Sequence, residues 1–180
     1  MTGYIEEARR SFEEYKQLAE KAFAQLTPPD WTRTLDPESN SIAIIVKHLA
    51  GNMRSRWTDF LTSDGEKPDR NRDQEFELSP ATTPEEIRRW WDSGWDCVFN
   101  ALAGLSDADL DRKVVIRGQH YSVMHAINRQ LLHYAQHIGQ IVLLAKHYRG
   151  PQWQTLSVPR GKSATAAFEL EAERHRRHNR

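Results

Sequence analysis

Apolar residues recur at three- and four-residue intervals in four separate stretches of this 180-residue chain. This spacing places the apolar side chains on one face of an α-helix and leaves charged residues on the other. It predicts helices over residues 2–26, 39–62, 83–105 and 122–149. Because each helix must bury its apolar face, we predict an all-α fold in which the four helices pack as a four-helix bundle.

Local signals mark the starts of the last two helices. Thr83 is a typical capping residue, Pro84 suits the first helical position, and Glu86 completes a capping box. Ser122 can cap the last helix, and Gly150, followed by proline, can end it.

Two connections depart from the helical pattern. The apolar residues of residues 63–82 show no regular spacing, which predicts a loop of about twenty residues. A loop of this length is uncommon in a compact domain and is often functional. Residues 113–123 carry apolar residues on both sides of Gly118 and Gln119, which predicts a short hairpin before the last helix.

Composition excludes several classes of protein. Lysine plus arginine total 25 and aspartate plus glutamate total 25, so no overall charge favours nucleic acid or an anionic membrane, and we expect neither partner. Cys97 is the only cysteine, which excludes a disulfide framework and a multi-cysteine metal site. The first fifteen residues contain no apolar run typical of a signal peptide, so we expect a cytoplasmic protein.

A pair of histidines is the first candidate for chemistry. His133 and His137 lie four residues apart on the predicted last helix, so both can reach one metal ion. A third ligand must come from a facing helix, and His48 lies on a mostly polar face of the second one. By spacing alone, an exposed polar face is the commoner interpretation of such a pair. We interpret the other five histidines as loop, cap, surface and tail residues: His120, His125, His147, His175 and His178.

A family resemblance changes that balance. Residues 41–52 (SIAIIVKHLAGN) and 54–61 (RSRWTDFL) resemble the second helix of DinB/YfiT-like proteins, and they are most similar to an uncharacterised bacterial branch of that superfamily. Three further segments also resemble that branch: residues 64–73, 132–141 and 153–161. The resemblance implies one DinB-like domain over residues 1–163, with a charged tail, residues 164–180, outside it.

The resemblance also implies a metal centre. Proteins of this superfamily carry a divalent metal, commonly nickel or zinc, on three histidines that correspond to His48, His133 and His137. Three imidazoles leave coordination positions open, which is typical of catalytic rather than structural sites. An ion held in this way can lower the pKa of water or bind a thiol as thiolate.

The resemblance favours one reaction, and two alternatives remain open. Characterised members are thiol-dependent transferases and isomerases that use low-molecular-weight thiols such as bacillithiol or mycothiol. This implies a metal-dependent transferase with a small-molecule substrate. The first alternative is a metal-dependent hydrolase with Asp59 or Glu75 as base. The second is a non-enzymatic stress-response or assembly protein in which the metal braces the helices.

Other polar residues are candidates for the surroundings of the metal, although no catalytic residue is assigned. We expect four of them to support the ligands or to bind substrate: Asn52, Asp59, Arg129 and Gln140. Arginines are suited to carboxylates, and the candidates are Arg54, Arg56, Arg70, Arg72 and Arg129. Ion pairing with Asp59, Asp69, Asp73 and Glu75 is an equally good interpretation of these arginines.

The third helix suggests an assembly state. Trp90, Trp91 and Trp95 cluster on it, which is more aromatic surface than one helix buries easily. Together with the family resemblance, this predicts a homodimer.

Overall fold

Four α-helices form close to the predicted positions in residues 2–163, which are the residues that the computed structural model describes. They are α1 (Tyr4–Phe23), α2 (Ile42–Trp57), α3 (Pro84–Ala103) and α4 (Val123–Arg149). Three of them begin at a side-chain cap, because Ser41, Thr83 and Ser122 each accept a hydrogen bond from a backbone N–H in the first turn. The predicted tail, residues 164–180, lies outside the described part of the chain.

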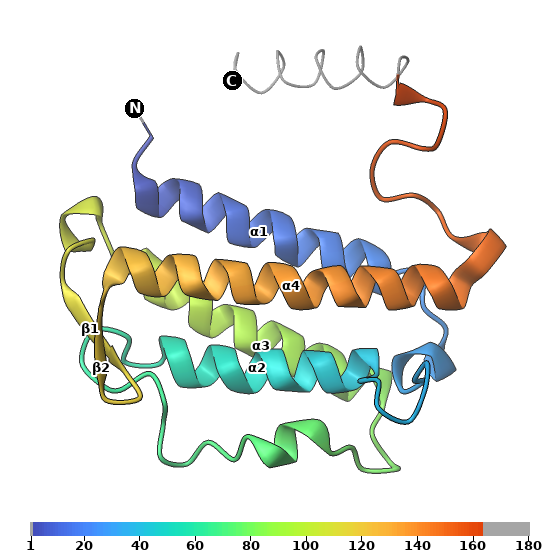
Figure 1. The fold of residues 1–180 in the computed structure, drawn as a ribbon, viewed down its shortest axis with the longest axis horizontal. Helices are drawn as coiled ribbons and strands as arrows, with labels where there is room; N and C mark the ends of the chain where they lie inside the picture. Colours follow the sequence, from blue (N-terminus) through green and yellow to red (C-terminus); the bar gives the residue numbers. More distant parts are fainter. Residues whose placement is uncertain (1, 164–180) are drawn as a thin grey trace.

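The helices pack side by side. α2 lies against α3 and α4, and α1 lies against α4 and α3 (Figure 1). A two-stranded antiparallel sheet at one end confirms the predicted hairpin: β1 (Lys113–Ile116) pairs with β2 (Gln119–Ser122), which leads directly into α4. The described chain is therefore mostly helical with one small sheet. None of its helices combines the length and the apolar character needed to cross a lipid bilayer.

The centre of the core contains one aromatic residue from each helix. Phe12 of α1 lies 5.7 Å from Trp57 of α2, 6.1 Å from Trp95 of α3 and 5.8 Å from Tyr134 of α4, measured between ring centroids. All four side chains are at most 2% exposed. Aromatic pairs at such separations add to the stabilisation from buried area, so this cluster ties the four helices together.

The second helix is shorter than predicted. It ends at Trp57 rather than near residue 62, because Thr58 is extended and Asp59 adopts a left-handed conformation with φ of 49°. The apolar pattern continues past this end because the Phe60 ring stacks on Trp57 at 5.0 Å without being helical.

The tryptophans of α3 are covered within the chain. Trp91 and Trp95 are 3% and 0% exposed, since they pack against Phe23 and Phe12 of α1. Trp90 is half-buried beneath the Lys47 ammonium group. These rings therefore give no support to a dimer interface on α3, because other helices of the same chain cover them.

The long loop, residues 63–82, runs beside α2 (Figure 1). It contains a short 3-10 helix, η2 (Asp73–Phe76), which packs against α2. Gly51 allows this close approach, because a Cβ atom there would lie 2.3 Å from Oε1 of Glu75. The three remaining 3-10 helices of the described residues are η1 (Pro28–Trp31), η3 (Asp107–Asp109) and η4 (Gly150–Gln152).

Candidate metal centre

Three histidines from two helices meet between α2 and α4. His133 and His137 project from successive turns of α4, and His48 projects from α2. Each offers one ring nitrogen, and these three nitrogens all lie within 4.8 Å of one another. The Nε2 atoms of His48 and His133 are 3.4 Å apart. The three side chains therefore lie close enough to hold one metal ion.

Hydrogen bonds at Nδ1 orient two of the rings so that their Nε2 atoms carry no proton. Oε2 of Glu75 lies 2.9 Å from Nδ1 of His48, and Oε1 of Gln140 lies 2.8 Å from Nδ1 of His137. Since both oxygens are acceptors, each Nδ1 carries the proton, and the lone pair belongs to Nε2. This is how metal-binding histidines are usually supported in proteins.

Burial keeps His133 and His137 neutral. Burial lowers the pKa of His133, and the neighbouring His137, His48 and arginine side chains add to this effect, so that its pKa falls to about 3. Burial also lowers the pKa of His137, although the hydrogen bond with Gln140 partly opposes this. A neutral imidazole is the form that binds a metal, so no proton has to be displaced from these rings near pH 7.

The donor set fits a divalent ion. Bonds of about 2.0–2.1 Å at a tetrahedral angle put two nitrogens about 3.3 Å apart, close to the 3.4 Å between His48 and His133. Imidazole nitrogens suit zinc, nickel, copper and iron. Three protein ligands would leave coordination positions for a further ligand.

The buried carboxylate of Glu75 supports the His48 ring at Nδ1. Besides contacting His48, Glu75 accepts hydrogen bonds from Arg70 at both oxygens, from Nε at 2.8 Å and from Nη2 at 2.9 Å. Burial raises the pKa of Glu75, but the hydrogen bonds from His48 and Arg70 lower it more. Glu75 therefore stays ionised and holds the His48 ring in place.

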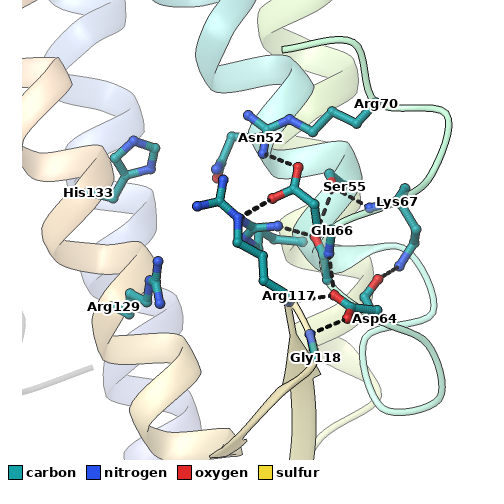
Figure 2. Close-up of polar contacts among 12 residues, drawn as sticks. Asn52, Ser55, Asp64, Glu66, Lys67, Arg70, Arg117, Gly118, Arg129 and His133 are labelled. Atoms are coloured by element: carbon teal, nitrogen blue, oxygen red, sulfur yellow. Dashed lines mark hydrogen bonds and ion pairs between the residues drawn. The ribbon is translucent and has the colours of Figure 1, made fainter.

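A cavity of about 190 Å³ opens beside the histidines. Its wall includes His48 and His133, so it borders the candidate metal position. The remaining lining residues are all polar or charged. Two are amides, Asn52 and Gln130, and five are arginines: Arg56, Arg70, Arg72, Arg117 and Arg129. Figure 2 shows His133 and Arg129 projecting from α4 toward the side of the site that carries Asn52, Arg70 and Arg117. The cavity is therefore strongly basic.

One carboxylate binds three of these arginines. Glu66 pairs with Arg56 at 2.9 Å, with Arg117 at 2.8 Å and with Arg70 at 3.3 Å (Figure 2). Partial burial raises the pKa of Glu66, but hydrogen bonds from Arg56 and Arg117 and the neighbouring positive charges outweigh it and lower the pKa to about 2. Glu66 thus joins α2, the long loop and the hairpin through one ionised group.

Comparison with known protein families identifies the chain at the level of family. A family model described as "Protein of unknown function (DUF1572)" matches residues 1–162. This chain belongs to the DUF1572 family. No curated protein and no solved structure matches it. The match to the DUF1572 model does not show membership of the DinB/YfiT-like superfamily, so that membership stays a prediction.

The structure of this DUF1572 protein places three of the four predicted supporting residues near the histidines. Asn52 is buried in the cavity wall, where its Oδ1 accepts a hydrogen bond of 3.1 Å from the Tyr134 hydroxyl. Arg129 lines the cavity, and Gln140 contacts His137. Asp59 lies apart from them, just past the end of α2, in a separate hollow that it lines with Phe60.

Among the contributors to the DUF1572 site, Arg117 and Glu66 were not predicted from the sequence. Arg117 comes from the tip of the hairpin, and Glu66 comes from the aperiodic loop. Nothing local in the sequence pairs them, because the ion pair spans 51 positions. The one available signal was the length of the loop, which predicted a functional role without indicating a residue.

Proposed function

We propose that this DUF1572 protein binds one divalent ion, zinc or nickel, through His48, His133 and His137, and that it acts on a small molecule at an open coordination position. The observation that carries the proposal is the convergence of three ring nitrogens within 4.8 Å beside a basic cavity. A purely bracing metal would be expected in a closed site with four protein ligands.

The ion, when bound, supplies Lewis acidity to a thiol or water molecule that reaches it. The side chains of the protein orient the ligand rings and set the charge of the cavity. Glu75 and Gln140 hold the His48 and His137 rings in the binding tautomer. The arginines of the cavity provide positive charge that favours the thiolate over the neutral thiol.

Our first candidate reaction is therefore transfer of a low-molecular-weight thiol, the reaction that the family resemblance implies. The hydrolase alternative uses Asp59 or Glu75 as a general base near the metal. Glu75 does not suit that role, because both of its oxygens accept hydrogen bonds and its pKa is lowered. Asp59 faces a different hollow. Thiol transfer needs neither group as a base.

The test begins with metal content. Untagged protein expressed with added zinc and nickel is expected to carry close to one divalent ion per chain by elemental analysis. Protein that stays metal-free would contradict the proposal. In cobalt-substituted protein, N-acetylcysteine is expected to change the visible spectrum through a new thiolate ligand. Cleavage of 4-nitrophenyl acetate without thiol, and no spectral response to thiol, would favour the hydrolase instead.

A further inference from the structure

The arginines of the cavity are not all neutralised. Three of the cavity arginines form ion pairs within residues 2–163: Arg56, Arg70 and Arg117 pair with Glu66 or Glu75. Within the same part of the chain, neither Arg72 nor Arg129 lies within ion-pairing distance of a carboxylate, although both line the cavity. Five guanidinium groups thus face two carboxylates, and the excess positive charge surrounds a space that water or a ligand can fill.

Two buried polar atoms in the wall also lack partners in the described structure. Arg56 and Gln130 are 4% and 3% exposed, and neither Nε of Arg56 nor Oε1 of Gln130 has a hydrogen-bond partner. Buried polar groups normally have such partners, since leaving one unpaired costs about 1–3 kcal/mol. Both atoms belong to side chains that line the cavity, so the polar groups of its wall are not all paired within residues 2–163.

Contacts within the chain support Arg117 and Arg129, two of the arginines that line the cavity. Arg117 occupies the hairpin turn with a left-handed φ of 55°. Asp64 holds this turn, because its carboxylate accepts 2.8 Å hydrogen bonds from the backbone N–H groups of Arg117 and Gly118 (Figure 2). Arg129 lies over the Tyr121 ring, with 5.7 Å between the guanidinium carbon and the ring centroid. The Arg117 side chain is itself paired with Glu66 at 2.8 Å, so both side chains have less freedom to lose on binding.

From this arrangement we propose that Arg72, Arg117 and Arg129 form a subsite for the oxyanion of a small acidic substrate, a carboxylate or a phosphate. The subsite lies in the same cavity as His48 and His133, so a bound substrate has its acidic group held by arginine and its other end near the metal position. This inference deepens the proposed function and rests on it, because it supplies the substrate class for that site.

The experiment measures anion binding to the full chain by calorimetry. The probes are succinate and inorganic phosphate, with succinamide as a neutral control of similar size. We expect at least one anion to bind and succinamide not to bind, with affinity falling as salt rises. The anion that binds more tightly distinguishes a carboxylate substrate from a phosphate substrate. Absence of binding by both anions at about 10 mM would overturn the proposal.

Matched variants separate the subsite from the metal. Arg72→Gln and Arg129→Gln are each expected to weaken anion binding by about tenfold or more, because a charge-assisted hydrogen bond is lost. Arg89→Gln, on an exposed part of α3 outside the cavity, should leave binding unchanged. Unchanged affinity in both cavity variants would overturn the proposal.

His137→Gln distinguishes failure of the subsite from failure of the metal site. His137 does not line the cavity, so this variant should lose metal but keep anion binding within about threefold. Loss of anion binding together with metal would mean that the anion binds the ion rather than the arginines, which contradicts the subsite. Anion binding that depends on the arginines in a protein without metal would support the subsite and refute the metal proposal.

Discussion

At the residue scale, the surroundings of each ring distinguish the candidate ligands from His120 and His125. His48 and His137 each have an acceptor at Nδ1, provided by Glu75 and Gln140. His120 and His125 are exposed near the hairpin and do not join the metal-binding group. The same residue type therefore serves two purposes, and its surroundings decide which.

We predict that His133→Ala and His137→Ala each remove most of the metal affinity while the helices stay folded. Loss of a direct ligand should cost more than the roughly 10–100-fold typical of residues that support a ligand. Bound metal and far-ultraviolet circular dichroism are measured on the same samples, with His125→Ala as the control that keeps its metal. Unfolding of either variant at room temperature would make the metal structural, and full occupancy would mean that the ligands are wrongly assigned.

We predict that Glu75→Gln weakens metal binding by about 10–100-fold without abolishing it. The amide can still face His48, but it lacks the negative charge that favours the Nδ1–H tautomer, and Arg70 loses a charged partner. Competition with a chelator measures the affinity. Glu77→Gln changes an exposed residue two positions away and should have no effect. Equal affinities in the two variants would show that Glu75 does not support His48.

At the element scale, the site depends on how closely the long loop approaches α2. Glu75 reaches His48 because η2 lies directly over Gly51. Glu66 of the same loop holds Arg56 of α2 and Arg117 of the hairpin. The loop is therefore the part of the chain that joins the metal centre to the basic cavity.

We predict that Gly51→Ala weakens metal binding in the same direction as Glu75→Gln. A Cβ atom at this position would lie 2.3 Å from the Glu75 carboxylate, which must move away from His48. Gly139→Ala on α4 is the matched control, because a Cβ there meets nothing within 4 Å. Alanine in a helix is otherwise stabilising by about 0.5–1 kcal/mol. A metal affinity for Gly51→Ala equal to that of the control would contradict this account of the close approach.

We predict that Glu66 stabilises the fold above about pH 5 and ceases to do so in acid. Its pKa falls from 4.5 to about 2 on folding, so its contribution is complete above 4.5 and is lost as the pH falls toward 2. Urea unfolding should show wild type more stable than Glu66→Gln by on the order of 1–3 kcal/mol at neutral pH, after allowance for solvent screening. The exposed Glu14→Gln is the control. A difference that stays constant down to pH 2 would refute this role.

At the scale of the whole molecule, the core and the metal centre are separate. The aromatic cluster of Phe12, Trp57, Trp95 and Tyr134 is almost fully buried away from solvent. The histidines lie beside a polar cavity instead. The core and the centre touch through Tyr134, whose hydroxyl accepts a 2.9 Å hydrogen bond from Trp57 and donates one to Asn52. The fold is therefore expected to persist without the ion.

The homodimer stays a prediction, and it now rests on the family resemblance alone, because the tryptophans of α3 are covered within the chain. Light scattering at tens of micromolar is expected to give about twice the 20.9 kDa of one chain. A mass of one chain at that concentration would contradict it.

The sequence alone determined the parts of this protein that depend on neighbours along the chain. Helical periodicity located four helices, Thr83 and Ser122 marked two of their starts, and the pattern around Gly118 predicted the hairpin. The four-residue spacing of His133 and His137 placed both on one helix face. Each of these features repeats or is completed within a few residues, so local rules suffice.

Only the tertiary structure decided which distant groups support the site. Glu75 meets His48 across 27 positions, and Glu66 meets Arg117 across 51. The loop that carries both carboxylates has no period, so no sequence rule orients its side chains. Similarly, the tryptophans of α3 exceed what one helix buries easily, but the packing of α1 against α3 covers Trp91 and Trp95. These contacts follow from how the helices pack, because long-range pairing depends on the shape of the whole core rather than on any local signal.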